Sequence, residues 1–303
     1  IDIISQLKDL LDVKFIDEYV RLLANIIDKW DTWGSNERHK IGTVSRSILQ
    51  WAWKPPEGLN QNQIQQLNEV IAVWGVPLVC KTYGENPQES RTILSNILDR
   101  LGPTSLISEI YRLVHEIDKI WPHDPEFVVS IYETVFKYEE TSEDKTFMGG
   151  SGVLTLTSTR RQDYSMCYYS LTENFPKFLS ANPLLATKAM VEAVNALVKR
   201  TEISRYSNSS KVESFSFSFF DLTAKYLPDG SCVWDENDFD RERSKILMSF
   251  DNYIFEISKD ESRRELLPNL IKQIVEMNEV AVIWRHLIKT ATRNPEIFSP
   301  ILY

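Results

Sequence analysis

The chain has 303 residues, of which 43% are hydrophobic and 25% are charged, an ordinary composition for a folded protein. This balance excludes wholesale disorder, and the length fits either two compact domains or one elongated array that adds hydrophobic core locally. The formal net charge of −9 disfavours polyanionic partners, so we expect a protein partner and no nucleic acid.

Three features of the sequence indicate the context and the cellular compartment of the chain. The chain begins with Ile1, so we expect it to be a segment of a larger protein. It opens without a signal-peptide pattern, and its apolar stretches are interrupted too early to cross a bilayer, as Val70–Cys80 is by a glycine and a proline. The cysteines form no C-x-x-C pair, which favours buried free thiols: Cys80, Cys167 and Cys232. We therefore expect a cytoplasmic chain with no membrane contact.

Apolar periodicity predicts helices along most of the chain. In the first third, apolar side chains recur at three- and four-residue steps over residues 15–33, 41–53 and 64–83, the last with a break at Gly75–Pro77. The same spacing predicts four later helices, over residues 184–198, 246–257, 266–277 and 280–292.

One opening signal occurs four times, as Asn or Asp followed by proline: Asn86, Asp124, Asn182 and Asn294. The Asn or Asp side chain accepts a hydrogen bond from an exposed backbone N–H, and proline at the first helical position loses no bond. The first two openers lie 38 residues apart. If insertions at about 139–161 and 207–240 are removed, a two-helix unit of about forty residues recurs, the period of HEAT and armadillo arrays.

These patterns predict an all-α fold over residues 1–303, a right-handed α-solenoid of HEAT- or armadillo-like helix pairs. An irregular helical bundle is the alternative, because Asn-Pro and Asp-Pro open helices in any α protein.

The two insertions differ in character. Residues 139–161 hold an acidic loop and a glycine-rich segment, Met148–Gly152, which predict a flexible connector. Residues 207–240 hold phenylalanines alternating with serines, followed by a Pro228-Asp229-Gly230 turn and then Cys232-Val233-Trp234. This pattern predicts a β-hairpin with one aromatic face. A helix is the alternative, because four of the apolar residues also fit a helical stripe: Phe215, Phe219, Leu222 and Tyr226.

No local motif predicts chemistry. The segment Gly149–Gly152 lacks the Lys-Ser/Thr that follows in a phosphate loop, and Asp235–Asp240 lacks the glycine and closing acid of a calcium loop. There is no G-x-S-x-G motif, Cys167 is expected in the core, and the histidines do not cluster like metal ligands: His39, His115, His123 and His286. We expect no catalytic residue, cofactor or metal, with an enzyme site assembled from distant residues as the alternative.

A small basic and aromatic cluster is the candidate for protein contact. Arg160, Arg161 and Tyr164 follow the glycine-rich insertion, and Lys199, Arg200 and Arg205 are further candidates. Loops inserted into repeat proteins collect on one face, often the binding face, and Arg and Tyr are favoured interface anchors. The alternative is an ordinary solvated helix start.

Part of the chain resembles a known family. The segments Tyr138–Ser142, Gly149–Ser151, Leu154–Tyr164 and Phe175–Leu179 are similar to the helical C-terminal region of large bacterial STAND-type P-loop ATPases. Such proteins combine an effector, a central ATPase and a C-terminal repeat array that senses a ligand, and several act in antiphage defence. The resemblance implies a sensor array or scaffold that contacts a protein partner or the rest of its own chain, with oligomerisation open. The Walker motif is absent from this segment, so the resemblance implies an ATPase only for the full-length protein.

Overall fold

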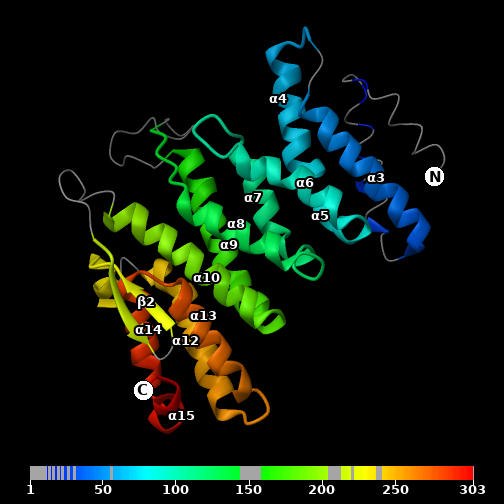
Figure 1. Ribbon diagram of the computed structural model, residues 1–303. Helices are drawn as coiled ribbons and strands as arrows, with labels where there is room; N and C mark the ends of the chain where they lie inside the picture. Colours follow the sequence, from blue (N-terminus) through cyan, green and yellow to red (C-terminus); the bar gives the residue numbers. More distant parts are fainter. Residues whose placement is uncertain are drawn as a thin grey trace. The chain divides into compact units, whose positions relative to one another are not determined.

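The computed structural model describes residues 32–54, 57–143, 158–203, 213–219, 222–236 and 241–302, with single positions between 12 and 29 (Figure 1). The described chain is mostly α-helical with one two-stranded antiparallel sheet, as predicted. It divides into two compact units, residues 1–127 with 140–167 and residues 128–139 with 168–303. Within the described ranges, every helix is too short or too polar to span a lipid bilayer.

The described part of the first unit includes α3 (Ser35–Ala52), α4 (Gln61–Val70), the π-helical turn η4 (Ile71–Gly75), α5 (Val76–Lys81), α6 (Pro87–Asp99) and α7 (Ile107–His115). Helix α5 packs against both α3 and α7. Its side chains Val79 and Cys80 are fully buried, as are Leu49 of α3 and Leu113 of α7. The apolar faces of α3 and α5, which the periodicity predicted, therefore meet in one core with α7, which it did not predict.

The predicted break at Gly75–Pro77 is wrong. The helical path continues through the π-helical turn, in which the Val76 N–H bonds to the Ile71 carbonyl, five residues back. Pro77 occupies one of the first two positions of α5, where a missing N–H is tolerated. A Cβ atom on Gly75 would lie 3.0 Å from Leu49 Cδ1, so the glycine permits the close approach of α3.

All four predicted openers are confirmed as helix starts. The helices that begin at their prolines are α6, α8 (Pro125–Lys137), α10 (Pro183–Val198) and α15 (Pro295–Leu302). The Asn86 and Asp124 side chains each accept a hydrogen bond from the backbone N–H of the residue three positions later, at 3.3 and 2.9 Å. Asn182 makes no such side-chain bond, so proline and the apolar face are sufficient to start α10.

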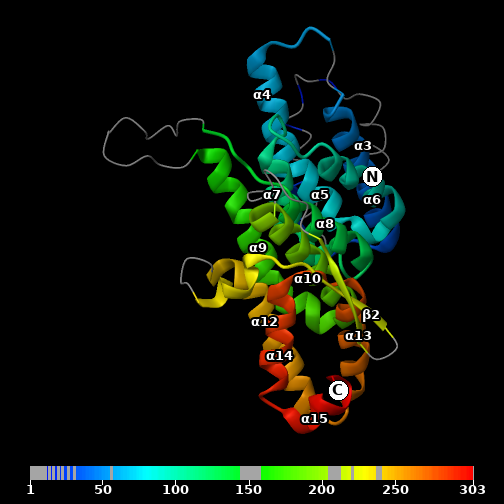
Figure 2. The same cartoon turned by 60° about the vertical axis from the view of Figure 1, so that its left-hand side comes forward.

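The second unit holds the C-terminal helices and the sheet. Its elements include α10, β1 (Phe215–Phe219), β2 (Leu222–Tyr226), a 3₁₀ helix (Gly230–Glu236), α12 (Arg241–Lys259), α13 (Leu267–Met277), α14 (Ala281–Ala291) and α15. Helix α10 packs against α13, and α12 packs against α14, as Figure 2 shows. The four predicted later helices are thus confirmed. Helices α8 and α9 (Thr159–Ala181) contribute residues to both units.

A β-hairpin is present as predicted, and its helical alternative is wrong. Its second strand is Leu222–Tyr226, however, and Cys232-Val233-Trp234, predicted to follow the turn, lie in a 3₁₀ helix. Strands β1 and β2 pair in antiparallel register from Phe215 opposite Tyr226 to Phe219 opposite Leu222. The predicted turn is misplaced, because residues 220–221, outside the described residues, join the strands. The Asp229 carboxylate instead accepts the backbone N–H groups of Ser231 at 2.8 Å and of Ala281 at 2.9 Å. The Pro-Asp-Gly segment therefore leads from the sheet into the 3₁₀ helix and contacts the start of α14.

The predicted insertions are only partly described. Residues 144–157, 204–212 and 237–240 lie outside the described residues, and they include the glycine-rich segment and Arg205. Helix α9 begins at Thr159, so the first insertion ends three residues before its predicted limit of 161. Arg160 and Arg161 therefore belong to the helix.

Candidate functional site

The structure does not bring the three predicted contact residues to one surface. Tyr164 is 2% exposed and lies in the core, which corrects its assignment as a surface anchor. The Arg160 guanidinium donates to the Ser105 carbonyl at 2.7 Å and to the buried Glu140 carboxylate at 2.9 Å. Its hydrogen bonds therefore stabilise the first unit. Arg161 is exposed and is the remaining member of the predicted patch.

The further basic candidates also have partners within the chain. Arg200 lies against Tyr168, with Nη1 donating to the tyrosine hydroxyl at 3.0 Å. The Lys199 ammonium lies 2.6 Å from the Glu279 carboxylate. Lys199 and Arg200 therefore both have bonding partners within the second unit.

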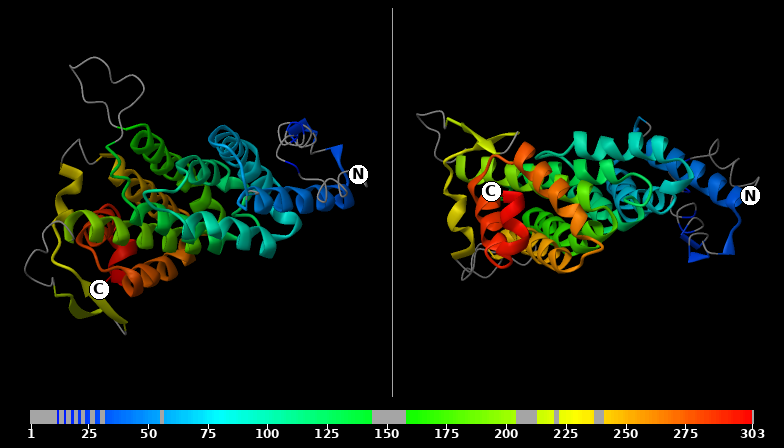
Figure 3. Two further views of the ribbon diagram at one scale, coloured as in Figure 1. Left: turned by 90° about the horizontal axis from the view of Figure 1, so that it is seen from above. Right: turned by 60° about the horizontal axis from the view of Figure 1, so that its bottom comes forward.

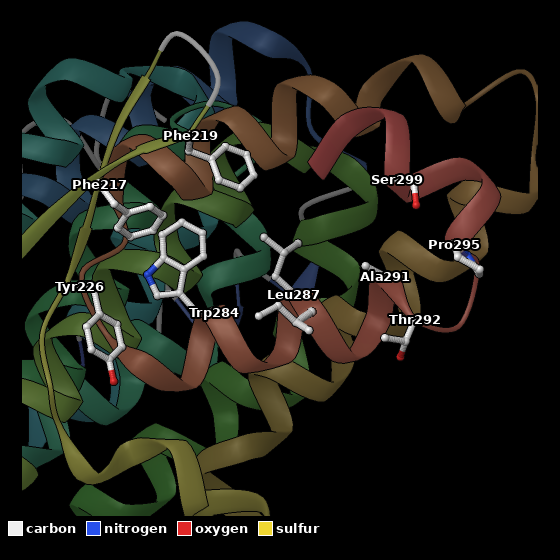
Figure 4. A pocket seen from close by; sticks show the side chains of 10 residues that line it. Phe217, Phe219, Tyr226, Trp284, Leu287, Ala291, Thr292, Pro295 and Ser299 are labelled. Atoms are coloured by element: carbon white, nitrogen blue, oxygen red, sulfur yellow. The ribbon is translucent and has the colours of Figure 1, made fainter. Parts of the chain in front are cut away.

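The second unit instead has an apolar groove between the hairpin and helices α14 and α15 (Figure 4). In both views of Figure 3 these elements lie beside the C-terminus. The groove has a volume of about 460 Å³, and the described residues that line it include no charged side chain. Its lining is Phe217, Phe219, Tyr226, Trp284, Leu287, Ile288, Ala291, Thr292, Pro295 and Ser299.

Two local patterns build this aromatic groove. Strand alternation places Phe217 and Phe219 on one face of β1, and three- and four-residue steps place Trp284, Leu287 and Ile288 on one face of α14. The Trp284 ring centroid lies 5.5 Å from that of Phe217 and 6.2 Å from that of Phe219, and Figure 4 shows both phenylalanines turned toward the indole. The aromatic wall is therefore already assembled in the free chain.

The groove side chains remain accessible. Ile288 is 61% exposed and Phe217 41%, large fractions for apolar residues in ordered elements. Sequence reasoning found the aromatic face of the hairpin but not the groove, because the opposing wall comes from α14, about sixty residues further along the chain.

Another pocket, of about 540 Å³, lies in the first unit, and its lining combines apolar and polar side chains. Its buried carboxylate, Glu109, accepts a hydrogen bond from Trp53 Nε1 at 2.7 Å and one from Arg100 Nη2 at 3.3 Å. The Arg100 guanidinium also lies 4.5 Å above the Trp53 ring. Burial raises the pKa of Glu109, and the Trp53 hydrogen bond and the Arg100 charge offset only part of that rise.

We expect Glu109→Gln to change how stability depends on pH. A raised pKa means that the folded chain binds this proton more tightly than the unfolded chain, so the Glu109 contribution destabilises the fold at neutral pH. That penalty shrinks as the pH falls through the raised folded pKa toward the unfolded value. Urea unfolding across this pH range is expected to show the variant gaining most over wild type near pH 7. A pH-independent difference would contradict this account.

Three other side chains of types that can take part in catalysis are buried: Cys80, Cys167 and His286. Among the described residues, no group of three or more His, Cys, Asp or Glu side chains could hold a metal ion. His286 Nδ1 lies 2.5 Å from Asp251 Oδ2, but both residues are buried, which makes the pair structural. Burial raises the pKa of the thiols of Cys80 and Cys167, as expected for core cysteines, whereas Cys232 is exposed, contrary to the prediction.

Comparison with known proteins found no matching family model, curated protein or solved structure.

Proposed function

We propose that this chain is a non-catalytic protein-recognition or scaffold segment and that the aromatic groove is its binding surface. The observation that carries the proposal is a preformed groove of about 460 Å³ whose described lining is apolar or uncharged. Apolar side chains that remain exposed in a rigid concave site mark binding surfaces. Such a lining recognises side chains by desolvation and shape, and its described polar groups are the hydroxyls of Tyr226, Thr292 and Ser299.

The anchors have the chemistry of interface hot spots. Trp284 is held in place because its indole Nε1 donates to the Lys225 carbonyl at 3.0 Å, which fixes the ring beside Phe217. A partner that covers Ile288 and Phe217 would remove large exposed apolar surfaces from water, a gain of roughly 25 cal/mol per Å² before the costs of association. Rigid aromatic anchors lower those costs because little side-chain freedom is lost on binding.

We further propose that the helices stack as right-handed HEAT-like pairs. The packing of α10 on α13 and of α12 on α14 supports stacked pairs in the second unit, and the recurring opener supports the period. The resemblance to STAND-type ATPases supports a cytoplasmic sensor array, or a scaffold beside it, in a bacterial defence protein. In such a protein the groove would bind a protein ligand or another part of the same large chain.

The test of the groove is selection of peptides from a displayed random library on the intact chain. We expect selected peptides to be rich in apolar residues and Ile288→Asp to lower their affinity about tenfold or more, because a carboxylate in the groove must be desolvated. Met248→Asp is the matched control, since Met248 is 45% exposed on α12 of the same unit and outside the groove. Failure to enrich peptides, or equal losses in the two variants, would exclude the groove as the binding surface.

A further inference from the structure

The two edges of the hairpin differ in how their backbone groups are satisfied. On the outer edge of β2, the Lys225 carbonyl accepts the Trp284 indole N–H at 3.0 Å. One step further along the same edge, the Leu227 N–H donates to the Glu279 carbonyl at 2.6 Å. The segment that joins α13 to α14 thus covers this edge of the sheet.

The outer edge of β1 has no such cover among the described residues. The sheet has the order β1–β2, so within the described ranges no strand lies on the far side of β1. The Lys225 carbonyl points outward to Trp284, and Lys225 lies opposite Ser216, so the pairs Ser216–Lys225 and Ser218–Thr223 do not exchange backbone hydrogen bonds across the sheet. The N–H and C=O groups of Ser216 and Ser218 therefore point away from β2.

Strand β1 also lacks the devices that normally protect an open edge. Its sequence from Phe215 to Phe219 contains no charge and no proline, and its register with β2 is continuous, without a bulge. Natural proteins place charges, prolines or bulges on exposed edge strands, because an open, flat, apolar strand pairs with other chains. An edge left open beside a preformed groove is suited to accept a strand.

We propose that β1 binds an extended segment of a partner protein as a third, antiparallel strand. This inference rests on the proposed function, and it specifies the partner as a segment with apolar side chains at alternate positions and no charge over five residues. A residue opposite Phe217 would project its side chain to the same face as Phe217, toward the groove. The residues on either side of it would exchange backbone hydrogen bonds with Ser216 and Ser218.

The charge distribution selects this partner. Neither β1 nor the described lining of the groove carries a charged side chain, so a charge in the bound segment would be desolvated without a counter-ion. A second copy of the chain is disfavoured, because each copy carries a net charge of −9 and the exposed Glu213 lies just before β1.

The test uses the intact chain and a fluorescent peptide, acetyl-Thr-Val-Thr-Leu-Thr-Val-Thr-amide. N-methylation of the two threonines beside the leucine removes the N–H groups that would bond to Ser216 and Ser218. N-methylation of the leucine and one valine, the matched control, alters the opposite edge of the peptide. We expect the first change to weaken binding about tenfold or more and the second to have little effect.

A variant of the chain provides the complementary measurement. Ser218→Pro removes an outward N–H that the β1–β2 ladder does not use, whereas Ser218→Thr retains it. We expect the proline variant alone to lose binding, with an unchanged circular dichroism spectrum and melting temperature.

Each outcome separates this inference from the groove itself. Equal binding of both methylated peptides, together with undiminished binding by Ser218→Pro, would overturn strand addition. The same result would not contradict binding in the groove if that binding still depended on Ile288. No binding of the unmethylated peptide would overturn strand addition as well. Concentration-dependent dimerisation in sedimentation experiments, abolished by Ser218→Pro, would assign the edge to a second copy and overturn the proposed partner.

Discussion

Replacing Tyr132 with alanine is expected to lower the free energy of unfolding of the second unit by about 4 kcal/mol. Tyr132 of α8 is fully buried. Its ring centroid lies 6.1 to 6.4 Å from those of three phenylalanines: Phe136, Phe175 and Phe178. Removal of the ring leaves a cavity among aromatic side chains that cannot collapse into it without losing their own contacts.

The conservative variant Tyr132→Phe separates the ring from its hydroxyl. The hydroxyl donates to the Leu171 carbonyl at 2.7 Å, so its loss is expected to lower the free energy of unfolding by about 1 kcal/mol. Denaturant unfolding, followed by circular dichroism and by tryptophan fluorescence, measures both variants. If alanine and phenylalanine destabilise the unit equally, the aromatic cluster is not the source of its stability.

The second large effect is expected at the buried Asp251–His286 pair. His286→Leu is expected to lower the free energy of unfolding by about 3 kcal/mol, because the Asp251 carboxyl group stays buried without the partner that lies 2.5 Å away. This pair joins α12 to α14, and α14 carries the groove residues Trp284 and Ile288. Weakening of this contact is therefore also expected to reduce peptide binding.

The double variant Asp251→Leu/His286→Leu is the decisive control. Replacement of both buried polar groups with apolar ones removes the unsatisfied carboxyl group, so much of the lost stability should return. A double-mutant cycle from urea unfolding gives the coupling energy between the two side chains. Additive losses in the cycle would contradict a direct interaction at this site.

The strongest sequence predictions were those whose causes lie within a few residues. The Asn-Pro and Asp-Pro openers located four helix starts because a cap and a proline act on the first turn of their own helix. Strict alternation of Phe and Ser predicted the hairpin because side chains in a strand alternate between faces. The weaker predictions concerned where an element turns and which of its side chains reach solvent.

The errors share one cause, which is contact with residues distant in sequence. Gly75 and Pro77 were expected to break a helix, but the path continues through a π-helical turn in which Gly75 lies against Leu49 of α3. Asp229 was expected in the hairpin turn, but it accepts the N–H of Ala281, 52 residues away. Arg160 was expected at a partner surface, but it bonds to the Ser105 carbonyl, 55 residues away.

The sequence by itself determined the helical class of the chain, the starts of its main helices and the aromatic face of its hairpin. Each of these follows from capping, proline geometry or side-chain periodicity, which act over one or two turns. The tertiary structure alone decided that Tyr164 is buried and that Phe217 faces Trp284 across a groove. It also decided that one edge of the hairpin is covered while the described chain leaves the other open. Those outcomes depend on which elements meet in space, and no local pattern specifies that.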